Sequence, residues 1–87
     1  MHTLTLIATN GTSIMLPCKW EHVRNVLPQA IETIEVSEDD ILLADGESIF
    51  KSLLLNIEAT EMSGTPVFGP AIIVSKKAYT QMKKSLN

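Results

Sequence analysis

Cysteine is nearly absent from this sequence, with Cys18 the only one among 87 residues. A single cysteine cannot form a disulfide within one chain, nor supply the cysteine pair of a zinc knuckle. Such usage is typical of proteins in a reducing cytosol. The length predicts one domain over residues 1–87, which buries only about 60–65% of the surface of its unfolded chain. Its own core therefore leaves little stability to spare.

Long apolar runs are also missing. The longest candidate, PVFGPAIIV at 66–74, contains two prolines and one glycine. It falls well short of the roughly 20 apolar residues of a membrane helix. Residues 1–13 lack the basic segment of a secretory leader. We therefore expect a cytoplasmic protein without a membrane partner.

Aromatic residues are scarce, at 5% of the chain, although hydrophobic residues reach 45% and the mean hydropathy is +0.16. The apolar content is therefore mostly aliphatic. A small domain with surplus aliphatic surface usually covers it in an oligomer or against a partner. This predicts self-association as a homo-oligomer.

Basic residues are few and unevenly placed. Nine of the ten acidic residues lie within 32–61, whereas four of the seven basic residues lie within 76–84. The net charge of −3 and a pI near 5.2 argue against general nucleic-acid binding. The split could instead pair the acidic middle of one subunit with the basic helix of another.

The stretch 4–16 predicts a β-hairpin, since two β-prone runs flank Asn10-Gly11. This pair is favoured in two-residue type I′ turns, which would place Ile7 opposite Ile14 and Leu6 opposite Met15. Both faces of the hairpin would then be apolar. Either the hairpin is covered on both sides within the domain, or one face meets another subunit.

The remaining pattern predicts an α+β fold in a single small domain, with one mixed or antiparallel sheet and two to three short helices. Residues 19–27 follow helical spacing, while 30–36 and 41–44 are strand-like. The run 67–74 is apolar throughout, as in a central strand covered on both faces. A last helix at 76–86 would begin at an N-cap, Ser75.

In that last helix, an inner stripe is predicted at Ala78, Tyr79, Met82 and Leu86. The opposite side carries Lys76, Lys77, Lys83 and Lys84. In the first helix, Trp20 falls on the apolar stripe, which favours core packing over a stacking platform for a base.

Residues 47–62 fit both helical and strand spacing. We expect a helical turn before Asn56 and extended chain after it. Asparagine at the end of an apolar run often marks where an element stops. Asn56 is thus interpreted first as a structural junction and second as the polar lip of a binding pocket.

No catalytic arrangement is present, so we predict a protein that is not an enzyme and needs neither cofactor nor metal. Cys18 and His22 provide only half of a metal site. The carboxylates of Asp39, Asp40 and Asp45 with Glu47 fit a solvated turn better than an acid–base pair.

Phosphate binding is the one ligand chemistry with some support. The loop 63–65 is rich in Gly, Ser and Thr and could expose backbone N–H groups to an anion, and lysines can hold phosphates. The candidate ligand-binding residues are Asn56, Thr60, Ser63, Gly64, Thr65, Lys76, Lys77 and Lys83.

One family likeness covers roughly residues 20–75. Its motifs are Ile31-Glu32 with Val36, the run 44–47 (ADGE), Asn56 with Ala59-Thr60, and Val67 and Gly69 ahead of an aliphatic strand. In this order the chain resembles a small phage- and plasmid-borne domain of unknown function, number 3846. It departs at Leu55, where a proline is common, and in its lysine-rich final helix.

The resemblance carries over no catalytic residue and implies a habitat, a bacteriophage or mobile element in a bacterial cytosol. Together with the lysines, it leads us to expect a non-enzymatic, homo-oligomeric counter-defence protein that sequesters a phosphate-bearing nucleotide signal. One alternative is an inhibitor of a host protein that uses an apolar hairpin face or the acidic middle. Another is an interaction module without a small-molecule ligand.

Overall fold

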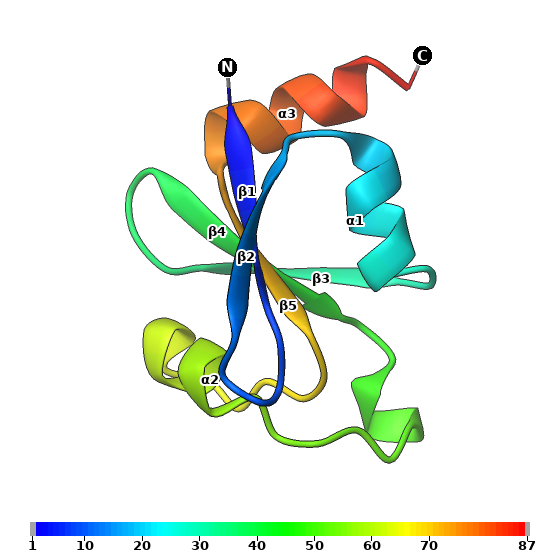
Figure 1. Cartoon of the computed structure of the whole chain (residues 1–87), viewed down its shortest axis with the longest axis vertical. Helices are drawn as coiled ribbons and strands as arrows, with labels where there is room; N and C mark the ends of the chain where they lie inside the picture. The colour runs from blue at the N-terminus through cyan, green and yellow to red at the C-terminus, as the bar shows by residue number, and fades with distance from the viewer. Residues whose placement is uncertain (1, 87) are drawn as a thin grey trace.

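A five-stranded antiparallel sheet forms the centre of the α+β fold (Figure 1). The computed structural model describes residues 2–86, with only the backbone of Ile49. The strand order is β2-β1-β5-β4-β3. The strands are β1 (Thr3–Ile7), β2 (Ser13–Pro17), β3 (Ile31–Glu35), β4 (Asp40–Asp45) and β5 (Ala71–Ser75). The predicted run at 67–74 thus contributes the central strand, which begins just after Pro70.

Helices lie at both ends of the molecule (Figure 1). Near the two termini are α1 (Trp20–Val26) and α3 (Lys76–Lys84), while the 3₁₀ helix η1 (Ser48–Phe50) and α2 (Ile57–Ser63) lie at the other end. No helix within residues 2–86 has the length and apolarity needed to cross a membrane.

The sheet is packed on both faces, because side chains of β4 and β5 alternate between two clusters. The larger cluster joins one face of the sheet to α1 and α3 through Val23, Leu27, Ile41, Leu43, Ile72, Val74, Ala78 and Met82. The smaller cluster, on the other face, contains Leu42, Ala44, Ala59, Val67 and Ala71. Burial on both faces explains why these two strands are apolar at nearly every position.

The predicted hairpin forms, but its pairing is shifted by one residue. Leu6 lies opposite Ile14 rather than Met15. The Ala8 N–H donates to the Thr12 carbonyl at 2.9 Å, and Gly11 has a φ of +89°. These features define a three-residue loop with glycine in the left-handed position, instead of a two-residue type I′ turn.

The shift moves every β2 side chain to the opposite face from the one predicted. Leu16 now joins Leu4 and Leu6 at the larger cluster. Ile14 and Met15 lie on the edge strand and are 54% and 68% exposed. The hairpin is therefore covered by the domain only in part.

The helices predicted at 19–27 and 76–86 are confirmed as α1 and α3. In α1, Val23 and Leu27 are buried, and Trp20 packs against the larger cluster. The Ser75 hydroxyl accepts a hydrogen bond from the Ala78 N–H, which caps α3 as expected. The inner stripe holds except at Leu86, which lies beyond the end of α3 and is 53% exposed.

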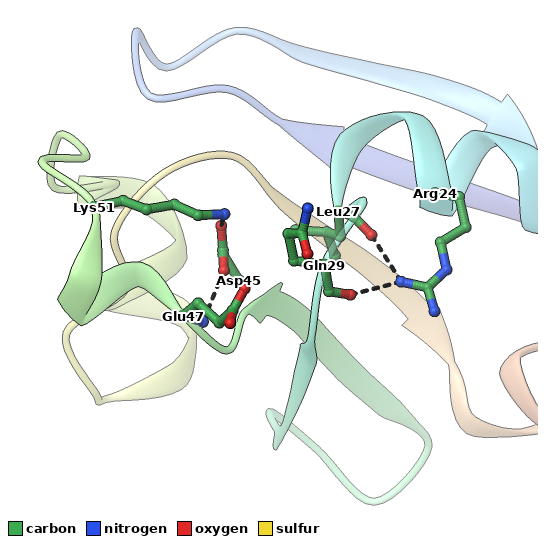
Figure 2. Close-up of polar contacts among 6 residues, drawn as sticks. All are labelled: Arg24, Leu27, Gln29, Asp45, Glu47 and Lys51. Atoms are coloured by element: carbon green, nitrogen blue, oxygen red, sulfur yellow. Dashed lines mark hydrogen bonds and ion pairs between the residues drawn. The ribbon is translucent and has the colours of Figure 1, made fainter.

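A buried carboxylate fixes the chain after β4 (Figure 2). The Lys51 ammonium lies 2.7 Å from Asp45 Oδ2, and the Glu47 N–H donates to Asp45 Oδ1 at 2.8 Å. The prediction of a solvated turn is therefore wrong for Asp45. On the other side of Figure 2, the Arg24 guanidinium donates to the carbonyls of Leu27 (3.2 Å) and Gln29 (2.6 Å), closing the turn between α1 and β3.

Replacing Lys51 with methionine tests the pH dependence of this contact. The hydrogen bond from Lys51 lowers the pKa of Asp45, the Glu47 N–H adds to it, and burial opposes it. A lowered folded-state pKa stabilises the protein above the unfolded pKa, near 3.9, and this stabilisation is lost as pH falls through the folded value. We expect Lys51→Met to cost about 1 kcal/mol of unfolding free energy at pH 7, and the gap to close below pH ~4.

Urea unfolding of both proteins across this pH range measures the gap. Lys51→Arg, which keeps the charge, is the matched control and should follow the wild type. A gap that stays constant down to the acid limit would contradict the assignment.

Candidate functional site

Asn56 is an almost completely buried polar residue, with 1% of its surface exposed. Its Nδ2 group donates to two carbonyl oxygens, those of Ile7 at 3.0 Å and Gly69 at 2.9 Å. Both amide hydrogens are thereby used. The side chain joins the end of β1 to the segment before β5, so Asn56 is a structural anchor, as its first interpretation predicted.

Asn56 also begins α2. Its Oδ1 accepts from the Ala59 N–H at 3.1 Å, and its backbone N–H donates to the Val67 carbonyl at 2.7 Å. The predicted helical turn before Asn56 corresponds to η1, but the extended chain after it is wrong. An N-cap asparagine satisfies a free N–H at the start of a helix, so here it initiates an element rather than ending one.

The predicted anion loop 63–65 ends α2 and uses its polar groups internally. The Gly64 N–H donates to the Thr60 carbonyl at 2.9 Å, and the Thr65 N–H donates to Ser63 Oγ at 3.2 Å. Thr60 Oγ1 accepts from the Val67 N–H at 2.9 Å. With a φ of +73°, Gly64 provides the left-handed residue that commonly follows a helix.

The predicted lysines lie elsewhere. Figure 1 places α3 at the end of the molecule opposite to α2, so the candidate ligand residues fall into two separate groups. Lys76 Nζ lies 3.0 Å from Glu35 Oε1. Lys83 Nζ lies 5.1 Å from the centre of the Tyr79 ring, and Lys77 is exposed.

A groove runs beside α1 and α3. A hollow of about 740 Å³ is lined by His2, Pro17, Cys18, Lys19, Trp20, Glu21, Ala78, Gln81, Met82 and Ser85. Next to it, Trp20 and Tyr79 lie with ring centres 6.2 Å apart and tilted by 33°. Arg24 and Lys83 lie over these two rings. This aromatic–cationic group was missed from the sequence, although the spacing of Tyr79 and Lys83, one helical turn apart, points to it.

Cys18 and His22 do not form a chemically reactive pair. Burial raises the pKa of the Cys18 thiol, which disfavours the nucleophilic thiolate. His22 Nδ1 lies 2.9 Å from the Pro17 carbonyl oxygen. Within residues 2–86, no group of three or more His, Cys, Asp or Glu side chains is placed to hold a metal ion.

Six large apolar side chains are exposed along the chain from η1 to the segment before β5. We call this set the apolar end. Phe50, Leu54 and Ile57 are the most exposed, at 85%, 72% and 63%. The set comprises Phe50, Leu54, Leu55, Ile57, Met62 and Phe68.

Backbone contacts hold the chain of the apolar end in place. Leu55 forms an isolated antiparallel bridge with Phe68, and the Gly69 N–H donates to the Leu54 carbonyl at 2.7 Å. Gly69 has a φ of +83°, and a Cβ there would lie 2.8 Å from Leu53 Cδ1. The backbone that carries Leu54 and Leu55 is therefore hydrogen-bonded to the segment before β5.

Comparison with known proteins adds no assignment: no protein-family model matches the chain, and no curated protein or solved structure matches it. The resemblance to domain of unknown function 3846 stays a prediction.

Asn56→Ala tests the anchor. The substitution leaves the carbonyls of Ile7 and Gly69 without their donor and removes the cap of α2. We expect a loss of about 3 kcal/mol in unfolding free energy, from about 1 for the cap and 1–3 for the buried carbonyls. Chemical denaturation followed by circular dichroism measures this loss.

Asn56→Asp is the companion variant. It keeps the capping oxygen and replaces the amide donor with a carboxylate that faces two carbonyls, so burial should raise its folded-state pKa. A raised pKa means that stability is highest at low pH and falls as pH rises through the folded value. The deficit of Asn56→Asp against wild type should thus grow with pH. Stability unchanged in both variants would refute the anchor.

Proposed function

We propose that this protein is a non-enzymatic binding module that recognises another protein through its apolar end. The observation that carries the proposal is the exposure of Phe50, Leu54 and Ile57 in a chain with so small an interior. Soluble monomers seldom leave several large apolar side chains of one short segment in water without a partner. Aromatic and aliphatic anchors at the centre of an interface supply most of its binding energy.

The binding energy available from the apolar end can be compared with the cost of association. Fully burying a Phe, Leu, Ile or Met side chain contributes about 1.5–3 kcal/mol. The exposed fractions of the six side chains add up to about three and a half full side chains, which provide on the order of 8 kcal/mol before the cost of association. Association costs about 4–15 kcal/mol. A specific complex therefore needs polar contacts around the apolar end as well.

Charge around the apolar end indicates the partner's chemistry. Glu58 and Glu61 are exposed on α2, and neither forms an ion pair with any part of the chain between residues 2 and 86. Carboxylates at the rim of an interface speed encounter with a basic surface and disfavour an acidic one. The expected partner presents an apolar patch bordered by lysine or arginine. On the family resemblance, it would be a protein of a bacterial host.

Phe50→Asp with Leu54→Asp tests the proposal. Both side chains are largely in water, so the double variant should fold like the wild type and lose binding at least about tenfold, which is about 1.4 kcal/mol. Affinity capture from a bacterial lysate, compared by quantitative mass spectrometry, would identify proteins that depend on these positions. Calorimetry with the purified partner would then give the loss of affinity.

Leu86→Asp is the matched control, because Leu86 is also exposed but lies near α3 at the other end of the molecule. It should retain the same partner as the wild type. If the double variant captures the same proteins equally well, the apolar end is not the binding surface.

A second candidate function is the capture of a phosphate-bearing aromatic ligand, such as a nucleotide signal, at the aromatic–cationic group next to the groove beside α1 and α3. The observation in its favour is the group of Trp20 and Tyr79 with Arg24 and Lys83 over their rings. Rings offer stacking surface for a base, and the lysines of α3 offer charge for phosphate. This moves the expected ligand site away from the loop 63–65.

Trp20, the only tryptophan, provides the readout for this candidate. Titration with nucleoside diphosphates, triphosphates and cyclic dinucleotides should change its fluorescence. Tyr79→Leu and Lys83→Glu should each weaken binding at least about tenfold, since one base–aromatic stack is worth about 1–3 kcal/mol. Lys51→Met is the control, because it removes a lysine next to η1, at the end of the molecule opposite to α3. Binding unchanged in both Tyr79→Leu and Lys83→Glu, or absent for every nucleotide, would exclude this site.

A further inference from the structure

The two edges of the sheet differ in charge. The outer strand β2 (SIMLP) carries no ionisable side chain, and four of its five residues are exposed. The other outer strand, β3, carries Glu32 and Glu35. Charged side chains are a common device against edge-to-edge pairing of strands. β3 has this protection and β2 lacks it.

The register shows which backbone groups of β2 are available. Hydrogen bonds from Ala8 N–H to the Thr12 carbonyl and from Cys18 N–H to the His2 carbonyl fix the alternation. Ile14 and Leu16 therefore pair with β1, whereas Ser13, Met15 and Pro17 turn their backbone groups outward. The edge presents N–H groups and carbonyls at Ser13 and Met15. Pro17 has no N–H, and its carbonyl already accepts from the Lys19 N–H at 2.9 Å and lies 2.9 Å from His22 Nδ1.

We propose that two copies of this chain pair antiparallel through β2, with a two-fold axis at Met15. Each Met15 N–H would donate to the Met15 carbonyl of the other copy, which gives two hydrogen bonds across the axis. Pro17, which has no N–H and a carbonyl bonded within its own chain, falls at the end of the ladder, where a missing rung matters least. The two sheets would become one continuous sheet across both copies.

The same register brings apolar side chains together. Ile14, which is 54% exposed, would lie beside Leu16 of the second copy, on the face that carries the larger cluster. The Met15 side chains would meet on the opposite face. No like charges are placed opposite each other, since the strand has none. A strand whose pattern complements itself in this way suits an isologous dimer.

Charge also explains why assembly would stop at two copies. After β2 pairs with β2, the free edges of the dimer are both β3 strands. Pairing β3 with β3 would bring Glu32 and Glu35 of one copy against those of another, which is unfavourable. A head-to-tail pairing of β2 with β3 would produce an open filament, but it would place uncharged β2 against the acidic edge.

Met15→Pro tests the pairing. Its N–H points away from β1, so proline there removes the outward donor and leaves the β1–β2 ladder intact. Native mass spectrometry and sedimentation of the wild type should give a mass twice the 9.6 kDa of one chain. The variant should give a folded monomer, with a dimer dissociation constant raised at least about tenfold.

Met15→Lys is the second variant, which retains the N–H but places two positive charges against each other, and it should also dissociate the dimer. If Met15→Pro fails to fold, the oligomeric state of Met15→Lys decides whether β2 forms the dimer contact. Thr33→Pro is the matched control on the other edge, because the Thr33 N–H also points outward; it should remain dimeric. A monomeric wild type, or a dimer that persists in both Met15 variants, would overturn the proposal.

Discussion

The amide of Asn56 is the contact on which one whole side of the molecule depends. It joins the last residue of β1 and the segment just before β5 to the first turn of α2, which belongs to no strand of the sheet. The anchor lies beside two other features of this side. Ala59 and Val67 pack over the sheet, and Leu55 forms a bridge with Phe68. Satisfied donors and acceptors make such a buried polar group specific to one arrangement.

This polar anchor explains why, between η1 and β5, large apolar side chains are exposed while small or polar ones are buried. The buried residues there are small or polar, namely Asn56, Ala59 and Val67, while Phe50 and Leu54 face water. A segment held mainly by its own large side chains would bury them. Because hydrogen bonds from Asn56 hold this one, its large side chains are left free for another surface, which is the physical basis for proposing that the apolar end binds a protein.

The sequence predicted the elements whose cause is local. The cap at Ser75, the stripe of α1 and the doubly apolar central strand each follow from residues within one or two turns. The sequence predicted Asn56 as a structural junction but not its hydrogen-bond partner Ile7, which lies 49 residues away. The hairpin register depends on whether Gly11 belongs to a two-residue or a three-residue loop, and the same sequence is compatible with both. The separation of Lys83 from the 63–65 loop depends on the strand order, which spacing alone does not provide.

Charge segregation links the two proposed interfaces. Acidic residues lie on β3 and beside the apolar end. The two proposed contact surfaces, β2 and the six side chains of the apolar end, are themselves uncharged. These surfaces use different elements, β2 for the second copy and η1 with α2 for the partner. Pairing through β2 would therefore present two apolar ends on one assembly. A dimeric or repetitive target would meet both, and the second contact, being intramolecular, would raise apparent affinity without any further contact surface. Small size and partial exposure limit what a single apolar end can bind, and dimerisation is the means by which this chain could exceed that limit.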